Sequence, residues 1–366
     1  MKKKIIIFMP TIDVGGVEKN FFIITDYLLK KYKYLSIISL SYKIKKRFGK
    51  KIKFVGPKSN IFNKFSRRLK FIISLFYLIR QIFLKKNIIV LCFQGNMYCV
   101  FICKIFGAKV ILRSNSSPKG WSKNIIKLQL YKWGFRCANG IIVNSKEFKK
   151  QLKDMFNVNA KCIYNPLNYY EIKKLSKQKI TFNFFDKKKL NIIKVARFED
   201  QKDHFTLLKA INIIKNKINL KLLLIGNGSN ELQIRKYIKD NGLKKIIKII
   251  KNIDNPFPYI VKSDLVILSS IYEGLPNILL ESIALNKFII SSKCPTGPKE
   301  ILDNGKGGLL FEIKDFKELS KKILFYKKNK SKLQKKIDYS KLTLNRYDYN
   351  KNLKKYYFYL NNIIKN

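Results

Sequence analysis

The sequence predicts an α/β fold with two doubly wound domains. Three observations predict it: apolar runs of four to six residues, glycine- or asparagine-containing turns after them, and helical patterns of 10 to 18 residues between them. Unbroken β-branched runs of this kind indicate parallel strands that helices cover on both faces. A length of 366 residues exceeds one comfortable core and suits two domains of roughly 170 to 190 residues each.

The predicted strands form two sets. The first set occupies residues 4–9, 35–40, 52–56, 87–93, 109–113 and 140–145. The second set occupies residues 191–196, 220–226, 246–250, 264–270, 287–292 and 307–311. In open parallel sheets, ligands bind beyond the carboxyl ends of the strands. We therefore expect every site residue to lie just after a strand.

A domain boundary is predicted near residues 164–171. There Asn165 and Pro166 stop a strand, and a polar stretch up to Lys189 precedes the next one. The first Rossmann-like domain then covers residues 1–165 and the second covers residues 166–345. Residues 346–366 have helical periodicity and are expected to pack back on the N-terminal domain.

Positive charge dominates the chain, with 77 Lys+Arg against 23 Asp+Glu and a formal net charge of +54. Residues 1–165 hold 35 Lys+Arg and 5 Asp+Glu, and no carboxylate occurs from Tyr27 to Lys146. Such a field attracts nucleic acid, phospholipid head groups or phosphorylated small molecules. Coding bias that enriches Lys, Ile, Asn, Phe and Tyr together explains part of the charge.

Three features bear on the cellular compartment. Residues 67–86 are the most membrane-like segment, but Lys70 and Arg80 interrupt it, which favours a buried helix over a span. Six cysteines without a CxxC pair indicate reduced thiols in a cytosolic protein. The N-terminal apolar run leads into a glycine turn, which favours a strand over a signal peptide.

Two loops have residues suited to an anion. Gly15 and Gly16 follow the first strand and permit a tight turn into a helix, whose N–H groups an anion or a sugar can approach. Neither the dinucleotide fingerprint nor the P-loop is present, so no nicotinamide cofactor is expected. Arg197 and Lys202 follow strand 191–196 and can hold a pyrophosphate. His204, the one histidine of the chain, fits a structural role better than a catalytic one.

The carboxylates Glu273 and Glu281 lie eight residues apart, on either side of a turn and a helix start near Asn277. One projects from the loop and the other from the helix, so both can edge one pocket with the helix N-terminus between them. Carboxylates accept hydrogen bonds from sugar hydroxyls, and the helix dipole attracts phosphates. This mixture fits a sugar diphosphate, although either glutamate alone would more often be a solvated surface residue.

With these motifs the chain resembles the retaining nucleotide-sugar glycosyltransferases of family 4, which have the GT-B fold, and among them the bacterial surface-polysaccharide enzymes. The resemblance rests on the Glu273–Glu281 pattern with EGLPN inside it, on VARFEDQKD (195–203) and on CPTGPKEIL (294–302), and it spans nearly the whole chain. It implies two Rossmann-like domains facing across a cleft, with acceptor binding in 1–165 and donor binding in 166–345.

The resemblance also implies roles for single residues. Arg197 and Lys202 would hold the donor pyrophosphate, while Glu273 would contact the transferred sugar and Glu281 the ribose. The backbone contacts to the donor would come from Gly15, Gly16, Gly274, Leu275, Pro276 and Asn277. Such enzymes are typically metal-independent and the sequence has no D-x-D, so neither a cofactor nor a metal is expected. Many relatives have a histidine in the first domain; here Gln94, Arg113 or Asn115 would occupy that acceptor-side space.

The scarcity of carboxylates also bears on the mechanism. An inverting transferase needs a base on the acceptor side. The first domain offers no histidine, and its carboxylates are Asp13, Glu18, Asp26, Glu147 and Asp154. A same-face substitution, in which the departing phosphate takes the acceptor proton, is therefore the favoured hypothesis.

The sequence thus predicts transfer of a hexose or N-acetylhexosamine, from a UDP-sugar rather than GDP-mannose, to a lipid-linked, lipopolysaccharide or capsule glycan. The expected location is cytoplasmic, peripheral on the inner face of the cytoplasmic membrane, with an anionic membrane surface as partner and no nucleic acid. Two alternatives remain open. Salt-dependent DNA binding without sugar hydrolysis would favour a nucleic-acid-binding protein. Undiminished turnover after Glu273→Ala would favour a non-catalytic scaffold.

Overall fold

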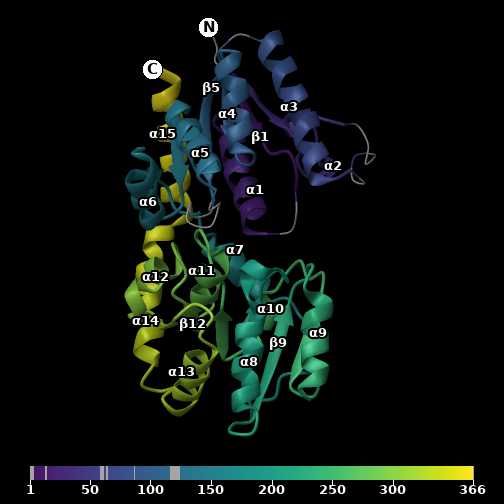
Figure 1. Cartoon of the computed structure of the whole chain (residues 1–366), viewed down its shortest axis with the longest axis vertical. Helices are drawn as coiled ribbons and strands as arrows, with labels where there is room; N and C mark the ends of the chain where they lie inside the picture. Colours follow the sequence, from purple (N-terminus) through teal and green to yellow (C-terminus); the bar gives the residue numbers. More distant parts are fainter. Residues whose placement is uncertain are drawn as a thin grey trace. The chain divides into compact units, whose positions relative to one another are not determined.

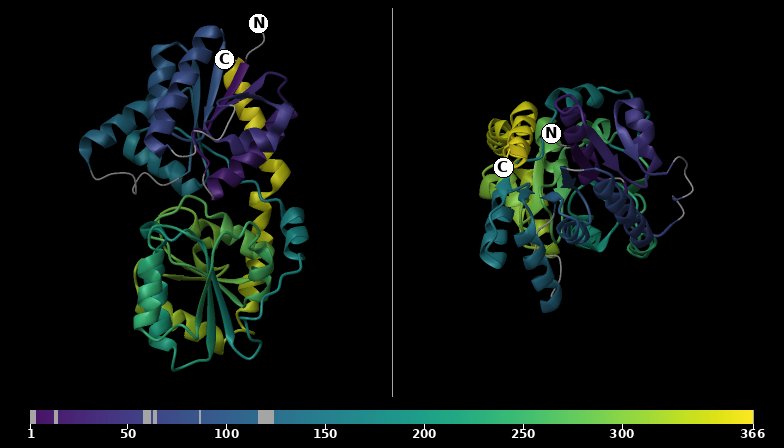
Figure 2. Two further views of the ribbon diagram at one scale, coloured as in Figure 1. Left: turned by 90° about the vertical axis from the view of Figure 1, so that its right-hand side faces the viewer. Right: turned by 90° about the horizontal axis from the view of Figure 1, so that it is seen from above.

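The computed structural model describes residues 4–12, 15–57, 62, 65–85, 87–115 and 124–365. The chain divides into two compact units: unit 1 is Met1–Pro166 with Asn350–Asn366, and unit 2 is Leu167–Tyr349. Each unit is built around one parallel sheet with helices on both faces (Figure 1 and Figure 2). The predicted fold class, two doubly wound α/β domains, is confirmed.

Unit 1 contains a seven-stranded parallel sheet in the order β3-β2-β1-β4-β5-β6-β7. Its strands are β1 (Lys4–Phe8), β2 (Leu35–Ile38), β3 (Lys53–Val55), β4 (Ile88–Cys92), β5 (Lys109–Ser114), β6 (Gly140–Val143) and β7 (Lys161–Cys162). Its helices are α1 (Gly16–Leu29), α2 (Tyr42–Phe48), α3 (Arg67–Leu84), α4 (Asn96–Ile105), α5 (Ile125–Cys137), α6 (Lys146–Phe156) and α15 (Tyr349–Lys365).

The strands of unit 1 are apolar on both faces because helices cover both. Alternate residues such as Ile6, Phe8 and Val90 pack in one core cluster with the buried residues of α3, α4, α5 and α6. On the other face, α15 lies close to β6, since a Cβ at Gly140 would overlap Ile363. Burial on both faces explains the unbroken apolar runs in the sequence.

Unit 2 contains a six-stranded parallel sheet in the order β10-β9-β8-β11-β12-β13. Its strands are β8 (Leu190–Val195), β9 (Leu220–Ile225), β10 (Ile247–Ile250), β11 (Leu265–Leu268), β12 (Phe288–Ser292) and β13 (Leu309–Phe311). Its helices are α7 (Tyr169–Ser176), α8 (His204–Ile214), α9 (Glu231–Asp240), α10 (Phe257–Lys262), α11 (Asn277–Ala284), α12 (Pro298–Ile301), α13 (Phe316–Lys328) and α14 (Gln334–Thr343).

Both strand orders reverse direction once. The reversal falls between β1 and β4 in unit 1, and between β8 and β11 in unit 2. In doubly wound sheets this reversal opens a crevice at the carboxyl ends of the two central strands, where ligands bind. The loops after these four strands are therefore the first places to examine for a site.

The helix predicted over residues 67–86 is present as far as Leu84, but it is buried on one stripe only; Lys86 lies outside the described residues. The segment is helical as α3, but Ile72, Phe76 and Phe83 are 51%, 66% and 70% exposed. The buried residues of this helix are Ser74, Leu78, Gln81 and Ile82, a different stripe. Within the described residues, none of the helices combines the length and hydropathy that crossing a membrane requires.

Candidate functional site

The carboxyl ends of β8 and β11 bring two of the predicted site residues together. Lys202 Nζ lies 2.6 Å from Glu273 Oε1, and the two side chains are 17% and 8% exposed. Ser270 Oγ donates a hydrogen bond to the same carboxylate oxygen at 2.6 Å. An ion pair so far out of water contributes little to stability, so we interpret it as a functional pair.

The two loops that carry this pair are joined through Gln201. Its Nε2 donates to the Tyr272 carbonyl at 2.8 Å, and its own carbonyl accepts from Ile271 N at 2.9 Å. The loop after β8 and the loop after β11 therefore hold a fixed relative position, which preserves the distance between the Lys202 and Glu273 side chains.

Arg197 does not take part in the Lys202–Glu273 contact. It follows β8 directly and its side chain is exposed, while the next residue, Phe198, is buried in the core. Within the described part of the chain the Arg197 guanidinium makes no ion pair. An exposed cation beside a strand end is available to a phosphate.

The second carboxylate, Glu281, is 7% exposed and lies on α11, which begins at Asn277. Gly274, Leu275 and Pro276 form the buried turn between Glu273 and this helix. The structure thus places both glutamates and the turn between them in one short stretch at the carboxyl end of β11.

Thr296 supports this turn, a role that the sequence did not reveal. Its hydroxyl donates to the carbonyl oxygens of Glu273, at 2.5 Å, and Gly274, at 3.1 Å. Gly297 has φ +63°, and a Cβ there would overlap the Gly274 carbonyl. The signal was present in the sequence: a Thr-Gly pair shortly after strand 287–292 lies at the same edge of the sheet as Glu273.

The two glycines of the loop after β9 allow this loop to lie close to the loop after β8. Gly226 and Gly228 have φ of +155° and +154°, and a Cβ on either would collide with the carbonyls of Ala196 and Phe198. The β9 loop can therefore lie directly on the β8 loop because these residues lack side chains.

His204 is buried at the start of α8, with its ring edge-on to Phe198 at 4.9 Å between centroids. Burial keeps the pKa of this imidazole well below its usual value, and the charges of Lys194 and Lys202 act in the same direction. A histidine that stays neutral and buried agrees with the structural role inferred from the sequence.

In unit 1, Gln94 lies at the point where the strand order reverses. It follows β4, and its Oε1 accepts from Thr11 N at 3.3 Å and Thr11 Oγ1 at 3.0 Å, just after β1. At the start of α1, a Cβ on Gly15 would lie 2.9 Å from a Glu18 oxygen, and the Gly16 carbonyl accepts from Asn20. Asp13 lies outside the described residues.

Arg113 and Asn115, also predicted on the acceptor side, differ in exposure. Arg113 is only 1% exposed, and its guanidinium donates to Tyr356 Oη and Asn165 Oδ1, both at 2.9 Å, and to Asn115 Oδ1. Asn115 is half-buried and donates to the Phe93 carbonyl at 3.3 Å. Of the two side chains, Asn115 is therefore the more accessible to a ligand.

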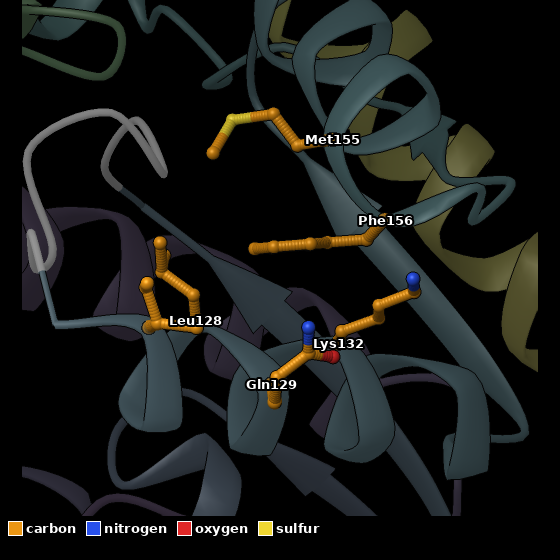
Figure 3. A pocket seen from close by; sticks show the side chains of 6 residues that line it. Leu128, Gln129, Lys132, Met155 and Phe156 are labelled. Atoms are coloured by element: carbon orange, nitrogen blue, oxygen red, sulfur yellow. The ribbon is translucent and has the colours of Figure 1, made fainter.

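A surface hollow of about 260 Å³ lies elsewhere, between α5 and α6 (Figure 3). Its lining consists of Ile125, Leu128, Gln129, Lys132, Met155 and Phe156. None of the predicted site residues lines it. Among the described residues no group of three or more His, Cys, Asp and Glu is placed to hold a metal ion.

The chain is similar to several known proteins. Residues 176–343 match the family model of glycosyl transferases group 1. An uncharacterized glycosyltransferase of Methanocaldococcus jannaschii is 31% identical over 221 residues, 56% of this chain and 53% of that protein. A Campylobacter jejuni N-acetylgalactosaminyltransferase, named for a diphospho-undecaprenol-linked substrate, is 24% identical over 226 residues, 59% of this chain and 60% of that protein. The chain thus spans somewhat more than half the length of these two relatives.

Among solved structures, HepE of Anabaena in complex with UDP-glucose superposes with a TM-score of 0.78. The sequences are 14% identical, and the match covers 98% of this chain and 99% of that one. A likeness at this identity establishes the fold. With further relatives that are named for capsular polysaccharide, amylovoran and lipopolysaccharide core biosynthesis, the matches confirm the resemblance to the polysaccharide-biosynthesis glycosyltransferases, while family 4 membership and the retaining mechanism stay predictions.

Proposed function

We propose, from the glycosyl transferases group 1 domain that the chain carries over residues 176–343, that this protein is a retaining glycosyltransferase. It moves a hexose or N-acetylhexosamine from a nucleotide-diphosphate sugar, with UDP favoured, to a lipid-linked, lipopolysaccharide or capsule glycan. The observation that carries the proposal is the shielded Lys202–Glu273 pair at the strand reversal of unit 2. The UDP-glucose bound to HepE and the undecaprenol-linked substrate of the Campylobacter relative support the donor and the acceptor class.

In this proposal Lys202 and Glu273 bind different parts of the donor. Lys202, together with the exposed Arg197, neutralises the diphosphate, and Glu273 accepts hydrogen bonds from the transferred sugar. Its Oε1 already accepts from Lys202 and Ser270, so the carboxylate has a fixed orientation. The backbone from Gly274 to Asn277 lines the sugar and phosphates, and Glu281 binds the ribose hydroxyls.

The chemical step forms one bond and breaks one bond on the same face of the sugar. The acceptor oxygen bonds to the anomeric carbon while the bond from that carbon to the diphosphate oxygen breaks. The acceptor proton passes to the departing phosphate oxygen, so no side chain has to act as base. Arg197 and Lys202 supply the positive charge that stabilises the leaving group, which removes the need for a metal ion.

The acceptor class suggests a lipid surface as partner, and unit 1 offers a matching face. Exposed apolar side chains continue from α3 over α4 to α5, which lie side by side. We call this the apolar face; its exposed members are Leu69, Ile72, Phe76, Phe83, Tyr98, Phe101, Ile105, Ile125, Ile126, Leu130 and Trp133. Ring contacts of Phe83 with Phe106, at 4.9 Å, and of Phe101 with Trp133, at 6.4 Å, connect the three helices.

The charge around the apolar face favours an anionic bilayer over a protein partner. Arg67, Arg68, Arg80, Lys104 and Lys127 are exposed on the same helices, and the stretch 27–146 that contains them has no carboxylate. Each such cation near an anionic leaflet contributes about 1 kcal/mol, and the exposed rings add apolar area at the head-group level. The proposed location is the inner face of the cytoplasmic membrane.

Thermal stabilisation of the purified protein tests the donor assignment. UDP-sugars are expected to raise the unfolding temperature more than GDP- and ADP-sugars, equally with and without EDTA. A ligand at 100 times its dissociation constant adds about 2.7 kcal/mol to the free energy of unfolding. Stabilisation by none of the three nucleotide classes would contradict the proposed function, and an inverted product anomer would contradict the same-face mechanism.

A further inference from the structure

A buried cation lies beneath the Lys202–Glu273 pair and has no role in the function proposed above. Lys194 is 1% exposed and stands near the carboxyl end of β8. Strand alternation puts it on the same face as Leu190 and Ile192, which belong to the core under α8. An ammonium in such a place is costly unless each of its N–H groups has an acceptor.

Three acceptors surround this ammonium. Lys194 Nζ donates to the main-chain oxygens of Lys202 and Asp203, the latter at 3.2 Å, and to Ser269 Oγ. Ser269 Oγ in turn lies 2.6 Å from the Asp203 carbonyl. Because Lys202 and Asp203 belong to the loop after β8 and Ser269 follows β11, this network joins the two loops from below.

Lys202 is therefore held at both of its ends. Lys194 binds its carbonyl oxygen, and Glu273 binds its ammonium at 2.6 Å. The next residue, Asp203, has φ +41° in the left-handed region, which non-glycine residues rarely adopt. Its carboxylate caps α8 by accepting from Thr206 N at 3.1 Å. The left-handed backbone of Asp203 sets the direction of the chain at Lys202, and the hydrogen bond from Lys194 to the Asp203 carbonyl stabilises this conformation.

We propose that Lys194 is a positioning residue, which ties the loop of Lys202 to the loop of Glu273 and so sets where Lys202 meets the diphosphate of the donor. The inference rests on the proposed function, because that function assigns Lys202 to the donor. An apolar side chain would be enough to fill the space under the loop. The ammonium is needed because it donates hydrogen bonds to two carbonyls and a hydroxyl.

The protonation of Lys194 adds a pH dependence. Burial lowers its pKa to about 7, aided by the charge of Lys202, while the carboxylates of Asp203 and Glu273 oppose the shift. His204, the other titratable group against it, stays neutral because burial keeps its pKa well below the usual value. As pH rises through about 7, the network loses a proton and a positive charge. Affinity for UDP is then expected to fall, relative to Lys194→Arg measured at each pH.

Stability is expected to move the other way. Between pH 7 and the ordinary lysine pKa of 10.5, the unfolded chain holds a proton that the folded chain has lost. The free energy of unfolding contributed by Lys194 therefore rises with pH in that range. A role confined to packing would not weaken UDP binding while stability increases, so the two pH profiles separate positioning from simple structural support.

A double-mutant cycle on UDP binding, measured by calorimetry on the full chain, tests the proposal. Lys194→Met is expected to weaken UDP binding about 10-fold, the loss of one charged hydrogen-bonding group. If Lys194 acts through Lys202, adding Lys194→Met to Lys202→Ala weakens binding no further. If the loss of UDP affinity in the double variant equals the product of the losses in the two single variants, the proposal is overturned. The matched control is Asn191→Ala, which removes a buried anchor to Asp186 at the other end of β8 and should leave UDP affinity unchanged.

Ser269→Ala provides a milder second variant if Lys194→Met does not fold. It removes one acceptor of Lys194 and is expected to weaken UDP binding about 3-fold, again only while Lys202 is present. An unchanged affinity in this variant would count against the network. Absence of binding to UDP, GDP and ADP by the unmodified protein would contradict the proposed function and this inference together. If the unmodified protein binds UDP but the losses of affinity of the two single variants multiply in the double variant, only the inference about Lys194 is overturned and the proposed function stands.

Discussion

One carboxylate oxygen of Glu273 accepts from both Lys202 and Ser270, and these contacts determine the expected effect of replacing Glu273. Glu273→Gln keeps the size of the side chain but removes the negative charge, which leaves the Lys202 ammonium, 17% exposed, without its counter-charge. We expect turnover of a UDP-sugar to fall by about 100- to 1,000-fold, comparable to losing one preorganised transition-state contact.

The matched control for this prediction is Glu312→Gln. Glu312 also pairs with a lysine in unit 2, Lys293, but its side chain is 62% exposed. Exposed pairs contribute little, so activity should stay within about twofold of the unmodified protein. Equal turnover in the two variants would argue against Glu273 as a sugar-binding residue.

Some site residues were predictable and others were not, for a physical reason. Lys202 and Glu273 were found because charged residues directly after a strand lie where parallel sheets bind ligands. Lys194 lies within a strand, and among 77 Lys+Arg nothing in the sequence distinguishes it. Ser269 and Thr296 act by hydrogen bonds whose partners lie more than 20 residues away in the sequence. Such roles depend on three-dimensional proximity.

At the scale of elements, α3 shows the limit of hydrophobicity as a guide. Its apolar sequence favoured a buried helix, yet only the stripe of Leu78 and Ile82 packs in the core. The long strands were predictable because covered parallel strands need continuous apolar runs. The two-residue strand β7 was expected only through its end before Asn165 and Pro166, because it is too short for a pattern of its own, and the helix α7 was missed because its segment is mostly polar.

The exposed stripe of α3 leads to a prediction about membrane binding. Replacing Phe76 and Phe83 together by Glu should reduce sedimentation with vesicles that contain anionic phospholipid by about 10-fold or more. Each ring contributes roughly 1.5 to 3 kcal/mol when buried, and the new carboxylates are repelled by the leaflet. Both side chains are largely exposed, so the protein should stay folded and lose only the contact between the Phe83 and Phe106 rings.

Leu232→Glu is the control for that experiment, because Leu232 is 80% exposed on α9 of unit 2, outside the apolar face. Vesicle binding should not change in this variant. Equal binding to purely zwitterionic vesicles would contradict the charge argument. A dimer that dissociates when Phe76 and Phe83 are replaced would identify a second copy of the chain, rather than lipid, as the occupant of the apolar face.

At the scale of the whole molecule, the helix α15 belongs to unit 1 although most of unit 2 precedes it. Its Tyr356 hydroxyl accepts from the buried Arg113 guanidinium at 2.9 Å. Tyr356→Phe leaves that donor without its acceptor, so the free energy of unfolding should fall by about 1.5 to 3 kcal/mol. Tyr357→Phe, on the half-buried neighbour, should have a smaller effect. Chemical denaturation followed by circular dichroism measures both; equal losses would show that the Arg113 contact adds nothing.

The passage of the chain between its units has a consequence for biogenesis. The segments that enter and leave unit 2 are bonded to each other, with Leu167 N donating to the Tyr347 carbonyl at 2.9 Å, so unit 2 is a closed insertion within unit 1. On the ribosome, the first sheet emerges early but waits for its last helix while the insertion is translated. At about 5 to 20 residues per second, this delay is on the order of ten seconds or more. During that interval the nascent first sheet lacks the helix that covers Gly140, and chaperones have their longest access to it.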